Sequence, residues 1–250
     1  MSSSDFCVIV PTYNNVKTLS AVIDSILPYT SKLIVVNDGS TDGTSGLLEN
    51  KKAELGDKLE VVTYGRNRGK WHAISKGLRA AAAAKFRYAI TMDSDGQHFA
   101  SDIPEFVAAA AAHPNTVIVG SRVLKTKNDV PQKNIAANKF SNFWFYVQTF
   151  INLPDTQSGF RLYPVEKINA IHIVSGRYEA ELEVLVRAAW RFIPITAIPI
   201  SVYYAPESER VSHFRPFTDF MRISLLNTFL TFAAIIWFYP RKIWRKIHTL

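Results

Sequence analysis

Two aspartates separated by a single residue follow an apolar segment in the first half of the chain. Residues 88–92 have the composition of a strand, and they are followed by Asp93, Asp95 and Gln97. Side chains of a strand alternate in direction, so backbone extended through Ser94 would direct both carboxylates to the same side. Two carboxylates that close repel each other unless a cation lies beside them. Together with an amide oxygen they suit Mg²⁺ or Mn²⁺, although Asp-Ser-Asp-Gly is also good chemistry for a metal-free turn.

The composition is that of a folded protein. Hydrophobic residues make up 48% and charged residues 20% of the 250 positions, enough for one large core or two modest ones. The single cysteine, Cys7, lies in an apolar run, so no intrachain disulfide is expected and a reducing compartment is favoured. Residues 1–5 are polar and lead directly into the first apolar run, so no signal peptide is expected.

The formal net charge of +8 is unevenly distributed along the chain. Half of it comes from a basic segment beside an apolar stretch at the C-terminal end: Arg241, Lys242, Arg245 and Lys246. A nucleic-acid-binding domain would more often spread its basic residues over a folded face. The charge therefore favours a membrane surface and phosphate-bearing substrates, and no nucleic-acid partner is expected.

The first half of the chain alternates short apolar runs with helical segments. Strands are expected at 6–10, 33–36, 59–64 and 87–92, and helices at 17–27, at 69–84 and from near Asp42, with Ser40 or Thr41 as its cap. This alternation predicts a mainly parallel sheet flanked by helices, an α/β fold. Loops after the strands then meet at one edge of the sheet, so the turns around Asp38 and Asp95 are expected to form a joint site.

The second half is less regular. A helix at 102–113 and a strand at 116–120 are expected, and Arg122 after that strand would point along the same edge as Asp95. The remaining expectations are a polar loop at 123–133, helices at 134–152, 178–190 and 220–239, and a strand at 193–204. The helix at 134–152 is rich in aromatic residues, which are typical either of a core or of a surface that meets lipid or a partner.

Five segments resemble the motifs of one enzyme family. They are Val10–Asn15 (VPTYNN), Val36–Thr44 (VNDGSTDGT), Asn67–Lys70 (NRGK), Asp93–His98 (DSDGQH) and Asp155–Arg161 (DTQSGFR). In their order and spacing they are similar to family 2 glycosyltransferases with the GT-A (Rossmann-like) nucleotide-sugar-binding fold, in the dolichol-phosphate mannosyltransferase-like branch. Asn15 and Asn37 depart from that pattern, because the family often has Glu and Asp there. Both departures remove a negative charge from the expected nucleotide pocket.

The resemblance implies a set of site residues. It implies nucleotide contacts from Pro11, Tyr13, Asn15, Asp38, Asn67, Lys70 and Asp93, and a divalent cation, Mg²⁺ or Mn²⁺, on Asp93, Asp95 and Gln97. The expected catalytic residues are Asp95, Arg122 and Arg161. The expected ligands of donor or acceptor phosphates are Arg122, Lys133, Arg161, Arg210, His213 and Arg215. The implied donor is a UDP- or GDP-linked sugar.

The acceptor is inferred partly from what the sequence lacks. Polymer-forming relatives carry a Glu-Asp pair and a Gln-x-x-Arg-Trp motif, and this sequence contains neither. A hydroxyl acceptor normally needs a general base, whereas a lipid phosphate is already ionised at neutral pH. The prediction is therefore a polyprenyl-phosphate acceptor and no protein base. The alternatives are a saccharide or lipid hydroxyl with Glu179 or Glu181 as base, a nucleotidyltransferase, and an inactive membrane scaffold.

The C-terminal segment is expected to associate with a membrane. The predicted division is a catalytic domain at 1–217 and a hydrophobic, basic segment at 218–250. Residues 223–239 form an apolar stretch of only 17 residues, and a single crossing would carry the basic end out of the cytosol. We therefore expect a peripheral or re-entrant segment on the cytoplasmic face of a membrane. A core helix packed on the catalytic domain is the alternative.

Overall fold

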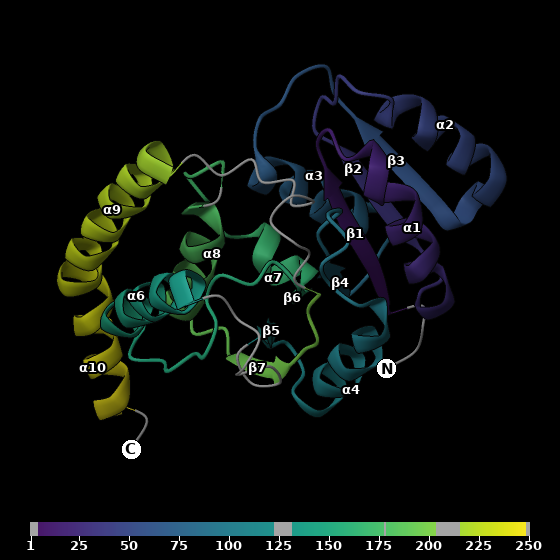
Figure 1. Ribbon diagram of the computed structural model, residues 1–250. Helices are drawn as coiled ribbons and strands as arrows, with labels where there is room; N and C mark the ends of the chain where they lie inside the picture. Colours follow the sequence, from purple (N-terminus) through teal and green to yellow (C-terminus); the bar gives the residue numbers. More distant parts are fainter. Residues whose placement is uncertain (1–4, 123–131, 178, 204–215, 249–250) are drawn as a thin grey trace.

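A computed structural model describes residues 5–122, 132–177, 179–203 and 216–248 (Figure 1). Its centre is a seven-stranded sheet with strand order β3-β2-β1-β4-β6-β5-β7. The strands are β1 (Phe6–Thr12), β2 (Leu33–Asn37), β3 (Leu59–Thr63), β4 (Tyr88–Thr91), β5 (Val117–Ser121), β6 (Arg161–Pro164) and β7 (Ile195–Pro199). Both pairings of β6 are antiparallel and the other four are parallel, so the predicted mixed, mainly parallel α/β sheet is confirmed.

Helices cover both faces of the sheet. They are α1 (Val16–Ile26), α2 (Thr44–Leu55), α3 (Lys70–Ala83), α4 (Ile103–Ala112), α6 (Gln132–Thr149), α7 (Val165–Asn169), α8 (Glu179–Trp190), α9 (Pro216–Ala233) and α10 (Tyr239–His248). Alternate residues of β1 enter different cores: Val8 packs with α1 and α4, whereas Ile9 packs with α3 and α8. This period of two is expected for a strand buried on both faces.

The parallel register brings the predicted polar turns to one edge. Thr12 of β1 lies opposite Asn37 of β2, which lies opposite Thr63 of β3, so these strands end level with one another. The turn that begins at Asp38 therefore lies beside the loop that follows β3. On the other side of β1, β4 ends at Thr91 and leads into Asp93. The expected joint edge is confirmed.

Two details of this edge differ from the sequence prediction. Strand β4 ends at Thr91, and residues 94–95 form a turn, so the backbone is not extended through Ser94. Helix α2 begins at Thr44, and its N-cap residue is Gly43, which has no side chain to cap the helix. The side chain of Asp42 accepts the backbone N–H of Thr44, so neither Ser40 nor Thr41 serves as the cap. In both places the short polar side chain bonds to nearby backbone and favours a turn.

Strand β6 and helix α7 were not predicted from the sequence. The strand has four residues, and its side chains are all buried although it begins with an arginine. It inserts between β4 and β5, where Arg161 lies opposite Thr91. Because β6 runs antiparallel to β4, the loop that precedes it arrives at the edge where β4 ends. This insertion places residues 155–160 beside the two aspartates.

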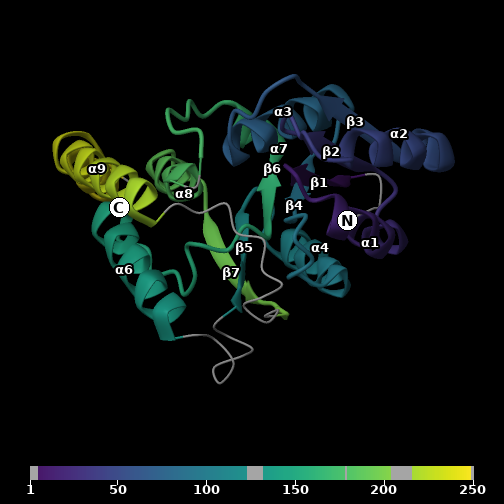
Figure 2. The same ribbon diagram turned by 45° about the horizontal axis from the view of Figure 1, so that its top comes forward.

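The C-terminal helices α9 and α10 are joined by a π-helical turn (Ala234–Phe238) and lie beside α6 in both views (Figures 1 and 2). Leu230, Ala234 and Phe238 are buried in the same core as α3 and α8. The boundary expected at 217/218 therefore falls inside α9, whose buried face packs on the catalytic part. By length and composition alone, the helical segment Met221–His248 is also long and apolar enough to cross a membrane.

Candidate active site

The centre of the polar edge is an ammonium group held between two carboxylates. Lys70 Nζ lies 2.7 Å from Asp93 Oδ1 and 2.5 Å from Glu181 Oε1. Burial alone would lower the pKa of Lys70, but the charges of Asp93 and Glu181 outweigh it and raise that pKa. Burial would likewise raise the pKa of Asp93, and Lys70 instead keeps it below its usual value. Asp93 is therefore ionised and already paired with a cation supplied by the protein.

Asp95 has no such compensation. It forms no ion pair with any residue in the described ranges, and its Oδ1 accepts only the backbone N–H of Gln97, at 3.0 Å. Burial and then the charge of Asp93 raise the pKa of Asp95 to about 6. Ionised Asp95 is therefore a carboxylate held in a poorly solvated place beside another negative charge. Such a group is stabilised by a cation.

The donor set at this turn fits a divalent cation that is completed by substrate. Within the described residues, no cluster of three or more His, Cys, Asp or Glu side chains forms a ready metal site. Mg²⁺ commonly takes only one or two carboxylates from the protein and completes its shell with water and substrate phosphates. Asp95 and Gln97 also border a cavity of about 420 Å³, so the uncompensated carboxylate faces space that a ligand can occupy. Asp93, Asp95 and the amide oxygen of Gln97 are therefore suitable ligands.

The start of α1 holds the aspartate turn in place. Asn15 Nδ2 donates to Ser94 Oγ at 2.7 Å, and Thr18 Oγ1 donates to the Ser94 carbonyl at 2.6 Å. Ser94 itself is buried. Asn15, expected to contact nucleotide, thus supports the turn in this structure. Pro11 is buried within β1, and Tyr13 follows it at the same edge as Asp38.

His98 is a member of the site that the sequence did not assign. Its ring is almost fully buried, with Nε2 4.0 Å from Asp93 Oδ2, and it packs against the ring of Phe160 at a centroid distance of 5.2 Å. Burial lowers the pKa of His98 to about 4, an effect that the charge of Asp93 opposes and that of Arg122 reinforces. The imidazole is therefore neutral near pH 7 and adds no charge beside Asp93.

Asp38 shapes the loop between β3 and α3. Its two carboxylate oxygens accept the backbone N–H groups of Arg68 and Gly69, at 2.7 and 2.8 Å. A side chain at Gly39 would meet the backbone of Arg66 at 2.4 Å, so the turn after β2 and this loop are in direct contact. Asn67 is exposed on the loop. Asp38 thus positions the predicted nucleotide contacts, and its own contact with nucleotide stays a prediction.

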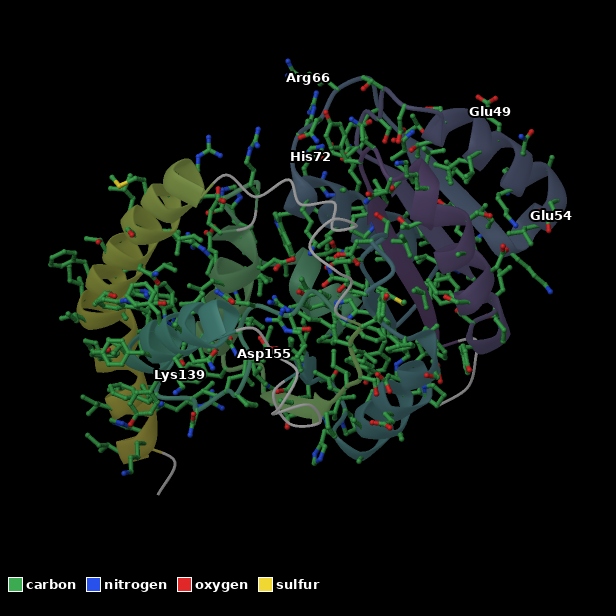
Figure 3. All side chains as sticks on the ribbon, in the orientation of Figure 1. Glu49, Glu54, Arg66, His72, Lys139 and Asp155 are labelled. Atoms are coloured by element: carbon green, nitrogen blue, oxygen red, sulfur yellow. The ribbon has the colours of Figure 1, made fainter. Side chains whose placement is uncertain are left out.

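Arg122 is paired with a buried carboxylate at this edge. Its guanidinium contacts Asp155 with Nε at 2.7 Å and Nη2 at 3.0 Å, in the two-bond geometry typical of arginine and carboxylate. Asp155, which is labelled beside α6 in Figure 3, is fully buried, whereas the Arg122 side chain keeps 22% of its exposure. The effect of Arg122 on the pKa of His98 places its charge near the aspartates. Arg122 is therefore positioned by Asp155 and still reaches solvent at the site.

The expectation that Arg161 contacts a phosphate does not fit its position. Arg161 is completely buried, and its guanidinium donates to the carbonyl oxygens of Thr156, Ser158 and Glu181 and to the Tyr163 hydroxyl. The guanidinium is thus held by protein acceptors in a place closed to solvent. Its position opposite Thr91 in the centre of the sheet requires this burial, because β6 is covered on both faces. Arg161 therefore organises the loop at 155–160.

Several other predicted residues cannot be placed. Arg210, His213 and Arg215 lie outside the described residues, and so does the side chain of Lys133 in α6. The loop expected at 123–133 falls almost entirely outside them as well.

The three glutamates of α8 have different surroundings. Glu183 is fully buried and bonds to the backbone N–H groups of Val174 and Ser175 and to Arg187. Glu181 pairs with Lys70, whereas one carboxylate oxygen of Glu179 is buried without a hydrogen-bond partner in the described part of the chain.

The aromatic residues of α6 divide between the two uses that the sequence left open. Phe145 is fully buried in the core. Phe140, Phe143, Tyr146 and Phe150 are exposed by 45–57%. The helix therefore contributes one side to the core and presents the other to its surroundings.

Removing the Lys70 ammonium is expected to destabilise the fold strongly. Lys70→Met leaves Asp93 and Glu181 close together, poorly solvated and without a counter-charge, which costs on the order of 3 kcal/mol of unfolding free energy. Adding Glu181→Gln should restore part of the loss, because one of the two carboxylates is then removed. Chemical denaturation of the two single variants and the double variant measures this coupling. Strictly additive losses would contradict the ion-pair arrangement.

Comparison with known proteins adds a family and a fold. The model of the family described as glycosyl transferase family 2 matches residues 7–171. A UDP-N-acetylglucosamine–dolichyl-phosphate N-acetylglucosaminyltransferase of Methanococcus voltae is 26% identical over 219 residues, covering 80% of this chain and 86% of the relative. The human dolichyl-phosphate beta-glucosyltransferase is 28% identical over 218 residues, covering 78% of this chain and 66% of the relative.

Among solved structures, the chain resembles the mannosyltransferase PcManGT from Pyrobaculum calidifontis, which was solved with GDP-Man and Mn²⁺. The TM-score is 0.56 at 18% sequence identity, and the match covers 92% of this chain and 73% of that one. At this level of identity the likeness shows the fold, and it confirms the GT-A architecture expected from the sequence.

Proposed function

The chain belongs to glycosyl transferase family 2 and is a glycosyltransferase, and we propose that it transfers a sugar from a nucleotide-sugar donor to the phosphate of a polyprenyl lipid. The relatives described above carry names that specify dolichyl phosphate as acceptor. The observation that carries the proposal is the ion pair between Glu181 and Lys70. In this pair the Lys70 ammonium engages the carboxylate of Glu181, one of the two candidate bases.

A general base must be able to take a proton from the acceptor. Glu181 Oε1 lies 2.5 Å from the Lys70 ammonium, so this carboxylate is already engaged in an ion pair. A phosphate acceptor avoids the problem, because its oxygen is already anionic near neutral pH. Arg122, which keeps part of its exposure and whose charge acts on His98, supplies positive charge to hold such an anion.

The reaction then needs no proton transfer from the acceptor. An oxygen of the lipid phosphate forms a bond with the anomeric carbon while the bond from that carbon to the diphosphate oxygen breaks. The bonding electron pair leaves with the nucleoside diphosphate. Asp93, Asp95 and Gln97 would hold the divalent cation, which offsets negative charge on the departing diphosphate. Asp38 contributes by fixing the backbone of the loop that carries Asn67 and Lys70.

A hydroxyl acceptor is the second candidate. Glu179 is the residue that favours it, because one of its carboxylate oxygens is buried without a hydrogen-bond partner among the described residues. A nucleotidyltransferase is distinguished by its product, because it releases pyrophosphate where a glycosyltransferase releases a nucleoside diphosphate. Incubation of the full chain with UDP- and GDP-sugars, Mn²⁺ and lipid acceptors, followed by nucleotide analysis, tests both the reaction class and the donor.

The place of action proposed is a membrane surface, and exposed apolar side chains on three helices support it. We define the α6/α9/α10 surface by its exposed apolar residues, which recur at helical spacing: Phe140, Phe143, Tyr146, Phe150, Leu225, Phe229, Phe232, Ile236, Ile243 and Ile247. The ring of Phe150 packs against Tyr239 of α10 at 4.8 Å, which joins the two helices. Exposed apolar area of this extent is typical of a membrane or partner contact.

The basic residues around this surface are not equivalent. Lys242 donates to the Thr149 carbonyl at the end of α6, and burial lowers its pKa. The guanidinium of Arg241 stacks over Trp237 at 4.3 Å. Lys246 is exposed. Lys242, one of the four cations expected to contact anionic lipid, is thus bonded to α6. One face of α9 packs in the core. An in-plane, peripheral arrangement on the cytoplasmic face fits both features.

Replacing part of the apolar face should release the protein from vesicles. Changing Phe229, Phe232 and Ile236 together to serine is expected to weaken binding to phosphatidylcholine–phosphatidylglycerol vesicles at least about tenfold, because burial of each side chain contributes about 1.5–3 kcal/mol. Val174→Ser, which changes an exposed apolar residue elsewhere, is the control. Co-sedimentation measures the effect. Unchanged binding, or wild-type protein that resists alkaline carbonate extraction, would contradict a peripheral arrangement.

A further inference from the structure

A second cavity lies on the other side of the β3–α3 loop, away from the aspartates. It measures about 290 Å³ and lies between α3 and residues 168–176. Neither Asp93, Asp95 nor any other residue assigned to metal or phosphate borders it. Its volume is at the lower end of the range of about 300–1,000 Å³ typical of small-molecule sites. The cavity is therefore suited to a small ligand.

The lining is basic and lacks any acidic residue. Arg68, His72 and Arg79 border it from the loop and from α3, and His172 borders it from the opposite wall. Among the described residues neither Arg68 nor Arg79 forms an ion pair, and neither has a side-chain hydrogen bond. Figure 3 shows His72 at the same end of the molecule as Arg66, the end at which the β3–α3 loop lies. Two permanent positive charges thus border one cavity whose lining contains no acidic side chain.

The neighbouring groups do not neutralise this charge. The carboxylate of Glu183 accepts the N–H groups of Val174 and Ser175 in the opposite wall, but it is paired with Arg187 at 2.5 Å. Burial lowers the pKa of His72, and the nearby charges of Arg68 and Lys76 lower it further, although the charge of Asp38 opposes them. This effect is independent support for excess positive potential at the wall of the cavity. Ser75 and Ser175 add neutral hydroxyl groups to the lining.

These features match a compact, multiply charged anion. Guanidinium groups form strong two-bond contacts with phosphate oxygens, and hydroxyl and imidazole groups can complete the contacts. The cavity lies apart from the α6/α9/α10 surface, because its walls are α3, α7 and the segment that follows α7. A soluble ligand is therefore favoured over a lipid headgroup.

We infer that this cavity is a second anion site that binds a small soluble phosphate, either inorganic phosphate or the terminal group of a small phosphate ester. A bound phosphate would join Arg79 of α3 to His172 of the opposite wall. It would also contact Arg68, whose backbone N–H is bonded to Asp38. Occupation of the site would thus add a link between two segments that already meet, through the bonds from Trp71 N–H to the Gly176 carbonyl and from Asn169 Nδ2 to the Leu78 carbonyl.

The inference is tested by phosphate binding in the presence of a chelator, which prevents metal-assisted binding at the aspartates. Calorimetric titration of the full chain with inorganic phosphate should show one site, and the melting temperature should rise with phosphate concentration. Arg79→Ala and His172→Ala should each weaken binding, by about tenfold for the arginine, which loses a charge-assisted contact. Arg191→Ala removes an exposed arginine at the far end of α8 and should bind as the wild type does.

Two results would overturn the inference, and neither depends on glycosyl transfer. One is the absence of saturable phosphate binding, or binding that Arg79→Ala leaves unchanged. The other is phosphate binding that Asp95→Asn abolishes, which would place the anion in the donor site. Vesicles containing phosphatidic acid provide a further arm. If only such vesicles bind, and Arg79→Ala prevents it, then the site recognises a lipid phosphate and the soluble ligand is wrong.

Discussion

Asp95→Asn is expected to abolish sugar transfer while leaving the fold intact or more stable. Transfer should fall by about three orders of magnitude, since the metal contributes several kcal/mol to charge stabilisation in the transition state. Binding of Mn²⁺, measured directly by calorimetry, should be lost as well. The loss of activity follows from the position of Asp95, a carboxylate without a counter-ion beside Asp93 and the cavity.

Asp95→Asn is expected to raise stability although it lowers activity, because the pKa of Asp95 is raised in the folded protein. Because the pKa of Asp95 in the folded protein is raised to about 6, ionisation of this group opposes folding. The metal-free wild type should therefore lose stability relative to Asp95→Asn as the pH rises from about 4, the value in the unfolded chain, through 6. Below that window the two proteins should melt alike.

An exposed aspartate far from the site provides the control for this test. Asp57→Asn changes an exposed aspartate whose side chain forms no hydrogen bond or ion pair among the described residues, and it should alter neither activity nor metal binding. Full transfer by Asp95→Asn, or by wild-type protein in excess chelator, would remove the metal from the proposed site.

The second large effect is expected at Arg161, and it is an effect on stability. Arg161→Lys should lower the free energy of unfolding by about 3–5 kcal/mol, the range for breaking a buried charged network. Lysine cannot reproduce the planar fork, so the carbonyl groups of Thr156 and Ser158 would lose their donors in a buried place. From the sequence alone, Arg161 was expected to be catalytic and to contact a phosphate, so Arg161→Lys would have lost more turnover than stability. The complete burial of Arg161 reverses that expectation.

Denaturation with urea and steady-state kinetics on the same samples separate these two expectations. Activity per folded molecule should fall much less than stability does. Arg122→Lys is the comparison, because Arg122 is partly exposed beside the site and should lose turnover with a smaller loss of stability. A stable Arg161→Lys variant with little turnover would restore Arg161 as a substrate contact.

Much of the fold could be predicted because its signals are local. The strands 6–12, 33–37 and 88–91 are short apolar runs followed by polar turns, and the sequence shows these directly. Parallel pairing then brings the turns to one edge by geometry alone. Strand β6 has no such signal, since it is four residues long and begins with Arg161. Only its neighbours in the sheet determine that the arginine is buried.

The chemistry of the site depends on contacts between residues distant in the chain. Asp93 and Asp95 are close in sequence and were identified, but the opposite shifts of their pKa values were not. That difference arises because Lys70 pairs with Asp93 and leaves Asp95 alone. The partners of Lys70 and Arg122, namely Glu181 and Asp155, come from other helices and loops. No periodicity in the sequence predicts such pairs.

The acceptor provides the most direct test of the proposed reaction. The full chain should be incubated with its nucleotide-sugar donor, Mn²⁺ and either a polyprenyl phosphate or the corresponding polyprenol, and the lipid product and the nucleoside diphosphate should be measured. We expect nucleoside diphosphate and a sugar-phosphate lipid only with the polyprenyl phosphate, since the structure engages Glu181 in an ion pair with Lys70. Equal or faster transfer to the polyprenol would contradict the proposed acceptor and favour a mechanism with a protein base.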